Sequence, residues 1–329
     1  MSFLIALGLS LLLTPAARRV GSALGMVDRP GSLKIHQKPI SVLGGGAVVA
    51  ATFGAFAITH DGLPAGLGVG VGLALATGII DDALHLPPWV RVALLCVAGV
   101  ALGLELVGLE LGLIGIVALV LACANAVNIV DGQDGLAGGL GAIAAVILAV
   151  LIGENSGLDG ALGFALGGAL AGFLLWNRPP ARIFLGNGGA YGVGASLAVL
   201  AAENVLRAGW RGLLAAGACL GVFACELVFT AARRLRSGKP LAIGDRDHTY
   251  DLLADGLQSR TRSTVLFWAL GGLTGGIAVA VNALPLSGGV VTVSIATGVA
   301  AAVAYLFRRR AIESATSAIQ RPGEPPRAP

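Results

Sequence analysis

Residues 125–139 read Asn-Ala-Val-Asn-Ile-Val-Asp-Gly-Gln-Asp-Gly-Leu-Ala-Gly-Gly and end a hydrophobic run that is otherwise typical of a membrane span. Four polar side chains recur in this segment every three residues, at Asn125, Asn128, Asp131 and Asp134. This spacing can keep them on one side of a helical turn. An ionisable group inside a membrane costs about 2.5–3.5 kcal/mol on insertion scales, so such groups usually mark a functional site. The alternative is a helix end with polar decoration.

The composition is that of an integral membrane protein. Of the 329 residues, 56% are hydrophobic and 12% are charged, whereas soluble domains carry about 25% charged residues. The 51 glycines suit close helix packing in lipid. Aromatic residues make up only 5% of the chain, so a base-stacking surface for nucleic acid has no support.

Apolar windows long enough to cross a bilayer predict an all-α bundle of about eleven transmembrane helices, or ten if two closely spaced windows do not both span. The windows cover residues 2–17, 44–60, 63–80, 89–107, 109–126, 136–153, 159–176, 190–206, 211–230, 264–283 and 287–307. We expect a single transmembrane domain over residues 1–307. A basic, Pro-rich and disordered tail is expected over residues 308–329.

The distribution of positive charge predicts the orientation. If the N-terminus lies outside and the C-terminus inside, twenty of the 22 Lys and Arg residues fall in inner segments, and only Arg207 and Arg211 fall outside. This is the positive-inside pattern. It predicts a multi-pass protein of the cytoplasmic membrane whose functional loops face the cytoplasm.

Asp81 and Asp82 end the third apolar window, on the same predicted face as residues 125–139. Adjacent carboxylates repel each other unless a cation compensates them. Mg²⁺ prefers oxygen ligands and is often held by one or two carboxylates together with substrate phosphates. A solvated helix end is the alternative for this pair alone. Together with Asp131 and Asp134, however, the pair makes four acids in one layer, which indicates a positively charged partner.

A glycine-rich loop, residues 182–194, precedes another apolar window on this face. Gly186, Gly188 and Gly189 could expose successive backbone N–H groups at a helix N-terminus and so bind an anion. Glycine-rich turns are common, so this segment is weak evidence by itself.

Two basic loops complete the predicted face. The inner loop over residues 231–263 contains Arg246 and His248, which are suited to gripping a phosphate, although a solvated basic loop is an equal alternative. The loop over residues 28–46 adds Lys38. Together these segments predict an acidic, metal-binding pocket surrounded by basic residues. Such a pocket fits a magnesium-dependent reaction of a phosphorylated substrate at the membrane face.

These segments, in this order, resemble the polyprenyl-phosphate N-acetylhexosamine-1-phosphate transferases, the MraY/WecA-like superfamily of glycosyltransferase family 4. Residues 125–136 follow the family signature Asn-x-x-Asn-x-x-Asp-Gly-x-Asp-Gly-Leu almost without departure. Residues 28–46 are similar to its Asp-x-Pro…Lys-x-His-x-x-Pro…Gly-Gly loop, and Asp81-Asp82 resembles its paired aspartates. The similarity covers residues 1–307.

The resemblance implies that a sugar-1-phosphate, of the N-acetylhexosamine type, passes from a UDP-sugar to a polyprenyl phosphate. UMP is released, and the product serves the synthesis of cell-envelope polysaccharide. Mg²⁺ is the implied cofactor, with Mn²⁺ as a substitute. The implied partners are the two substrates and membrane lipid, and a homodimer is allowed because many relatives are dimers.

By motif match, Asp81 would handle the lipid phosphate, Asp82 would support it and the metal, and Asp134 is similar to the residue that contacts the uracil. The implied catalytic residues are Asp81, Asp82, Asp131 and His248. The implied substrate-binding residues are Lys38, Asn125, Asn128, Asp134, Gly186, Gly188 and Arg246. The implied metal ligands are Asn128, Asp131 and Asn187.

The chain departs from the family pattern at two places. Asn187 stands where the family has an Asp that binds magnesium, and of a His-x-His-His run only His248 remains. Asp251 or Glu226 could supply the missing carboxylate. These changes leave three interpretations: a divergent active transferase, which we favour; a pseudoenzyme that binds lipid phosphate or nucleotide sugar without turnover; and, more remotely, a transporter.

Overall fold

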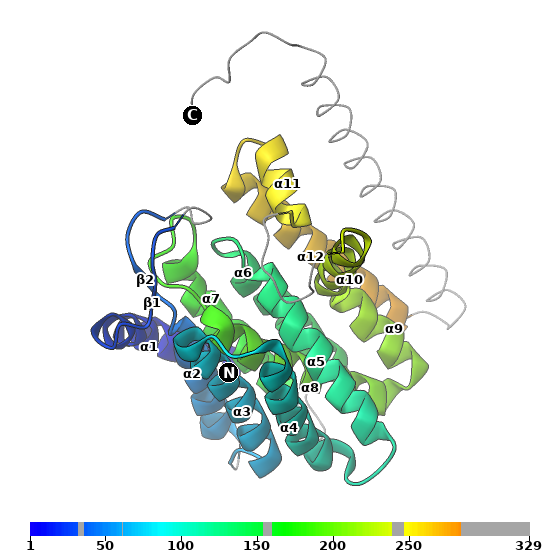
Figure 1. Cartoon of the computed structure of the whole chain (residues 1–329). Coiled ribbons are helices and arrows are strands. Elements are labelled where there is room, and N and C mark those ends of the chain that lie inside the picture. Colours follow the sequence, from blue (N-terminus) through cyan, green and yellow to red (C-terminus); the bar gives the residue numbers. More distant parts are fainter. Residues whose placement is uncertain (32–35, 61, 154–159, 239–246, 284–329) are drawn as a thin grey trace, which may run out of the picture.

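The computed structural model describes residues 1–31, 36–60, 62–153, 160–238 and 247–283. Within these residues the fold is almost entirely helical (Figure 1). The helices are α1 (Ser2–Ala23), α2 (Gly44–Thr59), α3 (Ala65–Leu84), α4 (Pro88–Val107), α5 (Gly112–Val130), α6 (Leu136–Ile152), α7 (Gly160–Asn177), α8 (Gly186–Ala208), α9 (Trp210–Cys219), α10 (Gly221–Arg236), α11 (Thr249–Gly256) and α12 (Arg260–Ala283). The strands β1 (Val27–Asp28) and β2 (Ile40–Ser41) form one short antiparallel pair.

The chain is a multi-pass membrane protein by the length and composition of its helices. Among the described residues, seven helices are long and apolar enough to cross a membrane, or up to eight if α9 and α10 form one broken span. Two shorter apolar helices, α2 and α6, accompany them. The prediction of an all-α membrane fold is therefore confirmed. The count of ten or eleven spans and the orientation stay predictions, and residues 287–307 and 308–329 lie outside the described residues.

The sequence predicts one transmembrane helix over residues 211–230, but these residues belong to two helices, α9 and α10, that meet at an angle of 71°. The break falls at Leu220, directly before Gly221. Glycine weakens a helix because it has more backbone freedom to lose, so a kink is favoured there. Hydrophobicity continues through the break, and for this reason the apolar window did not reveal it.

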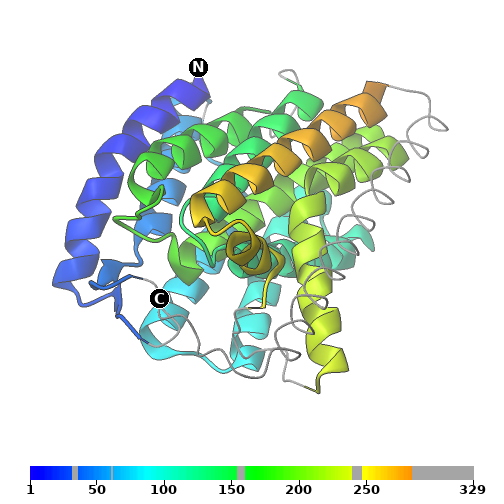
Figure 2. The ribbon, with the colours of Figure 1, turned by 90° about the horizontal axis from the view of Figure 1, so that it is seen from above.

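Helix α8 lies at the centre of the bundle and packs against α3, α5, α2 and α6 (Figures 1 and 2). It is the most buried of the candidate spans. Glycine permits the closest of these contacts: a Cβ on Gly45 of α2 would lie 2.0 Å from the Cα of Gly189. The first turn of α8 is thereby fixed between α2 and α3.

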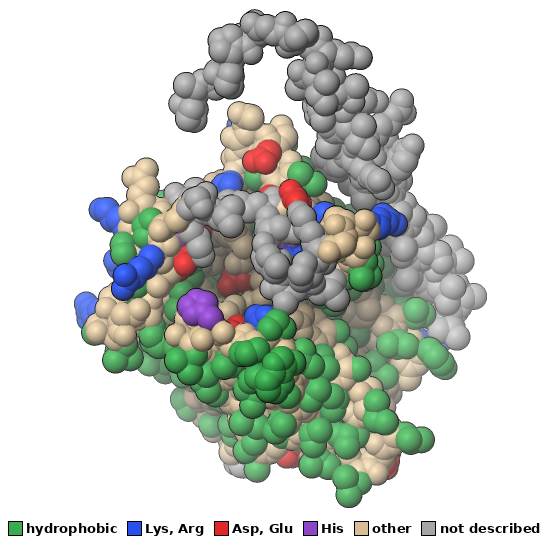
Figure 3. Space-filling view, viewed as in Figure 1, with side chains coloured by type: hydrophobic (Ala, Val, Ile, Leu, Met, Phe, Trp, Pro, Cys, Tyr) green, Lys and Arg blue, Asp and Glu red, His purple; other side chains and the backbone are tan. Residues whose placement is uncertain are grey.

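Charged side chains gather at one end of the bundle. Figure 3 shows hydrophobic side chains over the lower helices and charged ones in the upper part, around β1, β2 and α11. The links that follow α1, α5 and α7 meet at this end (Figure 1). Within the described residues, the polar segments singled out by the sequence therefore share one end of the molecule, and the prediction that this end faces the cytoplasm stays a prediction.

Candidate active site

The first turn of α8 holds a carboxylate of the protein itself. Gly186 begins this turn with a φ of +75°, a conformation that glycine adopts without strain. The backbone N–H groups of Asn187 and Gly188 then donate to the two carboxylate oxygens of Asp82, over 3.3 and 3.4 Å. A helix N-terminus favours an anion, and here that anion is Asp82. The prediction that Gly186 and Gly188 bind a substrate phosphate stays a prediction.

The side chain of Asn187 connects α5 with α3. Its Oδ1 accepts a hydrogen bond from Asn128 Nδ2 over 2.6 Å, and its Nδ2 donates to Asp81 Oδ2 over 3.0 Å. Helix α3 can approach this closely because residue 78 is a glycine: a Cβ there would lie 2.3 Å from the Asn187 carbonyl oxygen. The side-chain amide of Asn187 thus brings together three segments that are far apart in the sequence: the ends of α3 and α5 and the start of α8.

Asp81 is only 4% exposed and is held by donors on three sides. Besides Asn187, Arg91 of α4 pairs with its Oδ2 over 3.2 Å, and the backbone N–H of Leu86 donates to its Oδ1 over 2.9 Å. A buried carboxylate requires such partners to offset the loss of water. Arg91 therefore supplies part of the positive charge that the paired aspartates require. In the sequence it stands only as one of the positive charges of the inner segments.

Asp131 follows the last turn of α5, where its side chain is largely shielded from water. Burial raises its pKa well above the ordinary value, and the carboxylates of Asp82 and Asp134 add to this shift. A backbone hydrogen bond from Gly186 acts in the opposite direction. Because its negative charge is poorly compensated by the protein, Asp131 is the carboxylate at which a bound cation would be most stabilising.

Asp134 and Asn177 position the link between α7 and α8. Asp134 Oδ2 accepts the backbone N–H of Ala181 over 2.9 Å. Asn177 Oδ1 accepts the N–H of Gly135, and its Nδ2 donates to the carbonyl of Ile183, over 3.0 and 2.9 Å. Asn177 is buried and was missed by sequence reasoning because a lone Asn at a helix end carries no motif.

Two predicted substrate-binding residues lie at the margins of this cluster. Asn125 donates its side-chain N–H to the carbonyl of Leu121 in its own helix, over 2.8 Å, one turn deeper than Asn128. Lys38 is exposed, and its carbonyl accepts from His36 Nδ1 over 2.8 Å.

The loop that carries Lys38 adjoins the site through backbone and ring contacts. His36 pairs with Asp28 over 3.0 Å and packs edge-on against the ring of Phe184, with centroids 5.3 Å apart. The backbone N–H of Phe184 donates to the carbonyl of Ser41 over 2.9 Å. Residues 36–41, which follow in this loop, are therefore held against the link that leads to Asn187.

Helix α11 covers the end of α5. Tyr250 is 2% exposed and donates its hydroxyl to the carbonyl of Ile129 over 2.9 Å. Its oxygen would lie 2.1 Å from a Cβ on Gly132, so a glycine is required there. His248 is also buried, with its Nδ1 3.1 Å from the hydroxyl of Thr230, and its ring stacks on Tyr250 at 5.1 Å. Tyr250 therefore anchors the end of α5.

The two candidate replacement carboxylates are engaged elsewhere. Glu226 of α10 accepts the backbone N–H of Thr249 over 3.4 Å, and Asp251 lies 3.7 Å from Arg260 of α12. Both therefore support α11. Arg246, the remaining predicted substrate contact, lies outside the described residues.

Replacing Tyr250 by Phe should lower the activity of the site about fivefold, because one neutral hydrogen bond contributes about 1 kcal/mol and this bond positions the turn that ends in Asp131. The measurement is the turnover number of purified Tyr250→Phe, with the melting temperature recorded in parallel. A variant with unchanged turnover but a lower melting temperature would show that Tyr250 serves stability alone.

The donor set fits a hard divalent cation that is completed by substrate. Asp131 offers a carboxylate, and Asn128 and Asn187 offer amide oxygens, which are ligands that Mg²⁺ accepts. In the part of the chain that the structure describes, no three His, Cys, Asp or Glu side chains are grouped closely enough to hold a metal alone. Mg²⁺ commonly binds through one or two carboxylates plus phosphates and water, so such a group is not required.

Comparisons with known proteins agree with the sequence motifs. Residues 64–204, which include Asp81, Asp131 and Asn187, match the model of glycosyl transferase family 4. The chain is 28% identical to a probable undecaprenyl-phosphate N-acetylglucosaminyl 1-phosphate transferase of Bacillus subtilis over 290 residues, 81% of this chain and 80% of the relative. It is 30% identical to an undecaprenyl-phosphate alpha-N-acetylglucosaminyl 1-phosphate transferase of Thermotoga maritima over 234 residues, 69% of this chain and 72% of the relative.

A third relative is similar over a shorter part of the chain. A phospho-N-acetylmuramoyl-pentapeptide-transferase of Shouchella clausii is 34% identical over 172 residues, which is half of each chain.

Proposed function

Because the chain belongs to glycosyl transferase family 4, we propose that it transfers a sugar-1-phosphate of the N-acetylhexosamine type from a UDP-sugar to a polyprenyl phosphate, releasing UMP. Two of the relatives are named as undecaprenyl-phosphate N-acetylglucosaminyl 1-phosphate transferases. The observation that carries the proposal is the junction at Asn187, whose side chain hydrogen-bonds both Asn128 and Asp81.

In the proposed reaction, a phosphate oxygen of the polyprenyl phosphate attacks the phosphorus that carries the sugar. A new P–O bond forms, the bond to the UMP phosphate breaks, and UMP leaves with the electron pair. Asp81 lies in the last turn of α3, a candidate span, so a lipid phosphate could reach it while the polyprenyl tail stays in the bilayer. Arg91 and Asn187 hold its Oδ2 in place, which favours a role in orienting the phosphate.

Mg²⁺, or Mn²⁺ in its place, would be held by Asp131 with the amide oxygens of Asn128 and Asn187. The ion would offset the negative charge of the diphosphate. Asp82 would keep the first turn of α8 in register with these ligands through the N–H groups of Asn187 and Gly188. The protein's own contribution is therefore mainly positioning and charge compensation.

The nucleotide is proposed to bind beside Asp134. Only Oδ2 of this carboxylate has a hydrogen bond among the described residues, to Ala181, so Oδ1 can accept an N–H of the uracil. Lys38, His248 and Arg246 are proposed contacts of the phosphates. Positive charge on the inner segments supports placing the site on the cytoplasmic side of the cytoplasmic membrane. A homodimer stays a prediction.

The test is release of UMP by the purified protein in detergent, supplied with undecaprenyl phosphate, Mg²⁺ and a panel of UDP-sugars. We expect UMP only when lipid phosphate and a UDP-N-acetylhexosamine are both present. Binding of lipid or nucleotide without UMP across the panel would contradict the proposal in favour of a binding protein. Movement of a substrate across proteoliposomes without UMP would instead indicate a transporter.

A further inference from the structure

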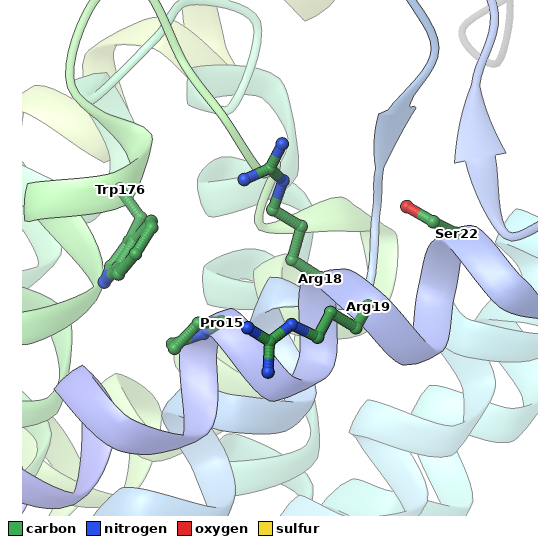
Figure 4. A pocket seen from close by; sticks show the side chains of 5 residues that line it. All are labelled: Pro15, Arg18, Arg19, Ser22 and Trp176. Atoms are coloured by element: carbon green, nitrogen blue, oxygen red, sulfur yellow. The ribbon is translucent and has the colours of Figure 1, made fainter.

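A hollow of about 480 Å³ opens between the end of α1 and the end of α7, apart from the residues proposed to react (Figure 4). It is lined by Pro15, Arg18, Arg19, Ser22 and Trp176. Figure 4 shows both arginine side chains leaning from α1 toward α7, with the ring of Trp176 across from them. The hollow therefore combines two cations, a hydroxyl and an aromatic wall.

The two guanidinium groups have no carboxylate partner within the part of the chain that the structure describes. Arg91 and Arg207, in contrast, are paired with Asp81 and Glu203. Two adjacent unpaired arginines raise the local affinity for an anion. Guanidinium groups match the oxygens of a phosphate in geometry and bind it strongly.

The position of the hollow favours a phosphate that belongs to a lipid. Helix α1 has 22 residues, a length of about 33 Å at 1.5 Å per residue, close to the roughly 30 Å of a bilayer core. Arg18 and Arg19 therefore lie at headgroup depth at one end of the span. Large apolar side chains are exposed on the part of α1 that precedes the arginines, on their bilayer side: Leu4 is 72% exposed and Leu12 73%. Acyl chains can lie along these residues while the headgroup enters the hollow.

We propose that this hollow binds the phosphate of an anionic phospholipid, at the end of the bundle where the candidate active site lies. Arg18 and Arg19 pair with the phosphate oxygens, and Ser22 donates its hydroxyl to the headgroup. The backbone carbonyl of Trp176 accepts the N–H of Arg182 over 2.8 Å. A lipid seated here thus lies against the base of the link between α7 and α8.

The competing explanation is that the arginines only extend toward water at the membrane surface, as cationic side chains at helix ends do. The double variant Arg18→Gln/Arg19→Gln separates the two. Its matched control is Arg236→Gln/Arg262→Gln, which removes two exposed arginines near α11, from α10 and α12. Melting temperatures of both double variants, and of the two single variants at positions 18 and 19, establish that the proteins are folded.

Delipidated protein in detergent is titrated with phosphatidylglycerol, phosphatidylcholine or glycerol 3-phosphate, and bound lipid is counted by native mass spectrometry. We expect phosphatidylglycerol to bind the native protein and the control pair equally. It should bind the Arg18/Arg19 variant about tenfold or more weakly, because charge-assisted hydrogen bonds to the phosphate are lost. Equal loss in the control pair, or no loss in the Arg18/Arg19 variant, overturns the site. Displacement of phosphatidylglycerol by equimolar glycerol 3-phosphate would assign the hollow to soluble phosphate esters and overturn its assignment to lipid.

Discussion

We expect replacement of Asp131 by Asn to abolish the proposed sugar-1-phosphate transfer, lowering kcat about a thousandfold, which is the upper range for removing one group that stabilises charge in a transition state. Asn matches Asp131 in size, so the change removes charge and leaves the packing at the end of α5 intact. The measurement is UMP release from a UDP-N-acetylhexosamine and undecaprenyl phosphate at saturating Mg²⁺.

A second readout connects this loss to the metal. A ligand that binds only the folded protein raises its melting temperature, so Mg²⁺ should raise the melting temperature of the native protein and leave that of Asp131→Asn unchanged. Asp255→Asn is the matched control, because Asp255 is exposed on α11 at the same end of the bundle. An Asp131→Asn protein that keeps more than a tenth of the native kcat would remove Asp131 from the proposed metal site.

The membrane fold could be predicted because each membrane helix is a continuous apolar stretch, which is visible in the local sequence. The residues that α3 and α5 contribute to the site were predictable for the same reason. Asn128, Asp131 and the Asp81-Asp82 pair all lie where an apolar run ends. A charged group at the end of a membrane span is costly, so such groups usually have a function. The neighbouring residues alone show that a charge has this position.

The remainder depended on contacts between distant segments. Asp81 and Arg91 are joined only because the turn after α3 returns α4 alongside it, and neither residue reveals the pairing. The hydroxyl of Tyr250 reaches a backbone carbonyl 121 positions earlier in the chain. The glycine-rich start of α8 indicated an anion-binding helix N-terminus, but the sequence could not show that the side chain of Asp82 accepts hydrogen bonds from two of its N–H groups.

Replacing Asn187 by Asp should have opposite effects with and without Mg²⁺. In the native protein the Asn187 amide donates to Asp81 and accepts from Asn128. An aspartate cannot donate, and its charge would face that of Asp81. In the presence of a chelator, the free energy of unfolding should therefore fall by about 1–3 kcal/mol, the cost of an unsatisfied buried group. Thermal melting in EDTA measures this loss.

With Mg²⁺ present, the same carboxylate becomes an additional charged ligand. We expect the Mg²⁺ concentration that gives half-maximal UMP release to fall about tenfold, equivalent to about 1.4 kcal/mol, because charged ligands bind more strongly than neutral amides. Asn177→Asp is the matched control: Asn177 is also a buried, bridging amide, but it holds Gly135 and Ile183. It should lose stability whether or not Mg²⁺ is present.

The two Asn→Asp variants together separate a metal ligand from a structural amide. A general cost of placing a carboxylate in this bundle lowers the stability of both proteins, and Mg²⁺ restores neither. A metal held between α5 and α8 restores Asn187→Asp alone, since only that carboxylate shares the ion with Asp131. If Asn187→Asp stays inactive at every Mg²⁺ concentration while its fold is intact, the hydrogen bonds from Asn128 and to Asp81 are themselves required. Asn187 would then act by positioning Asp81, and the metal would be held by Asp131 and the substrate phosphates.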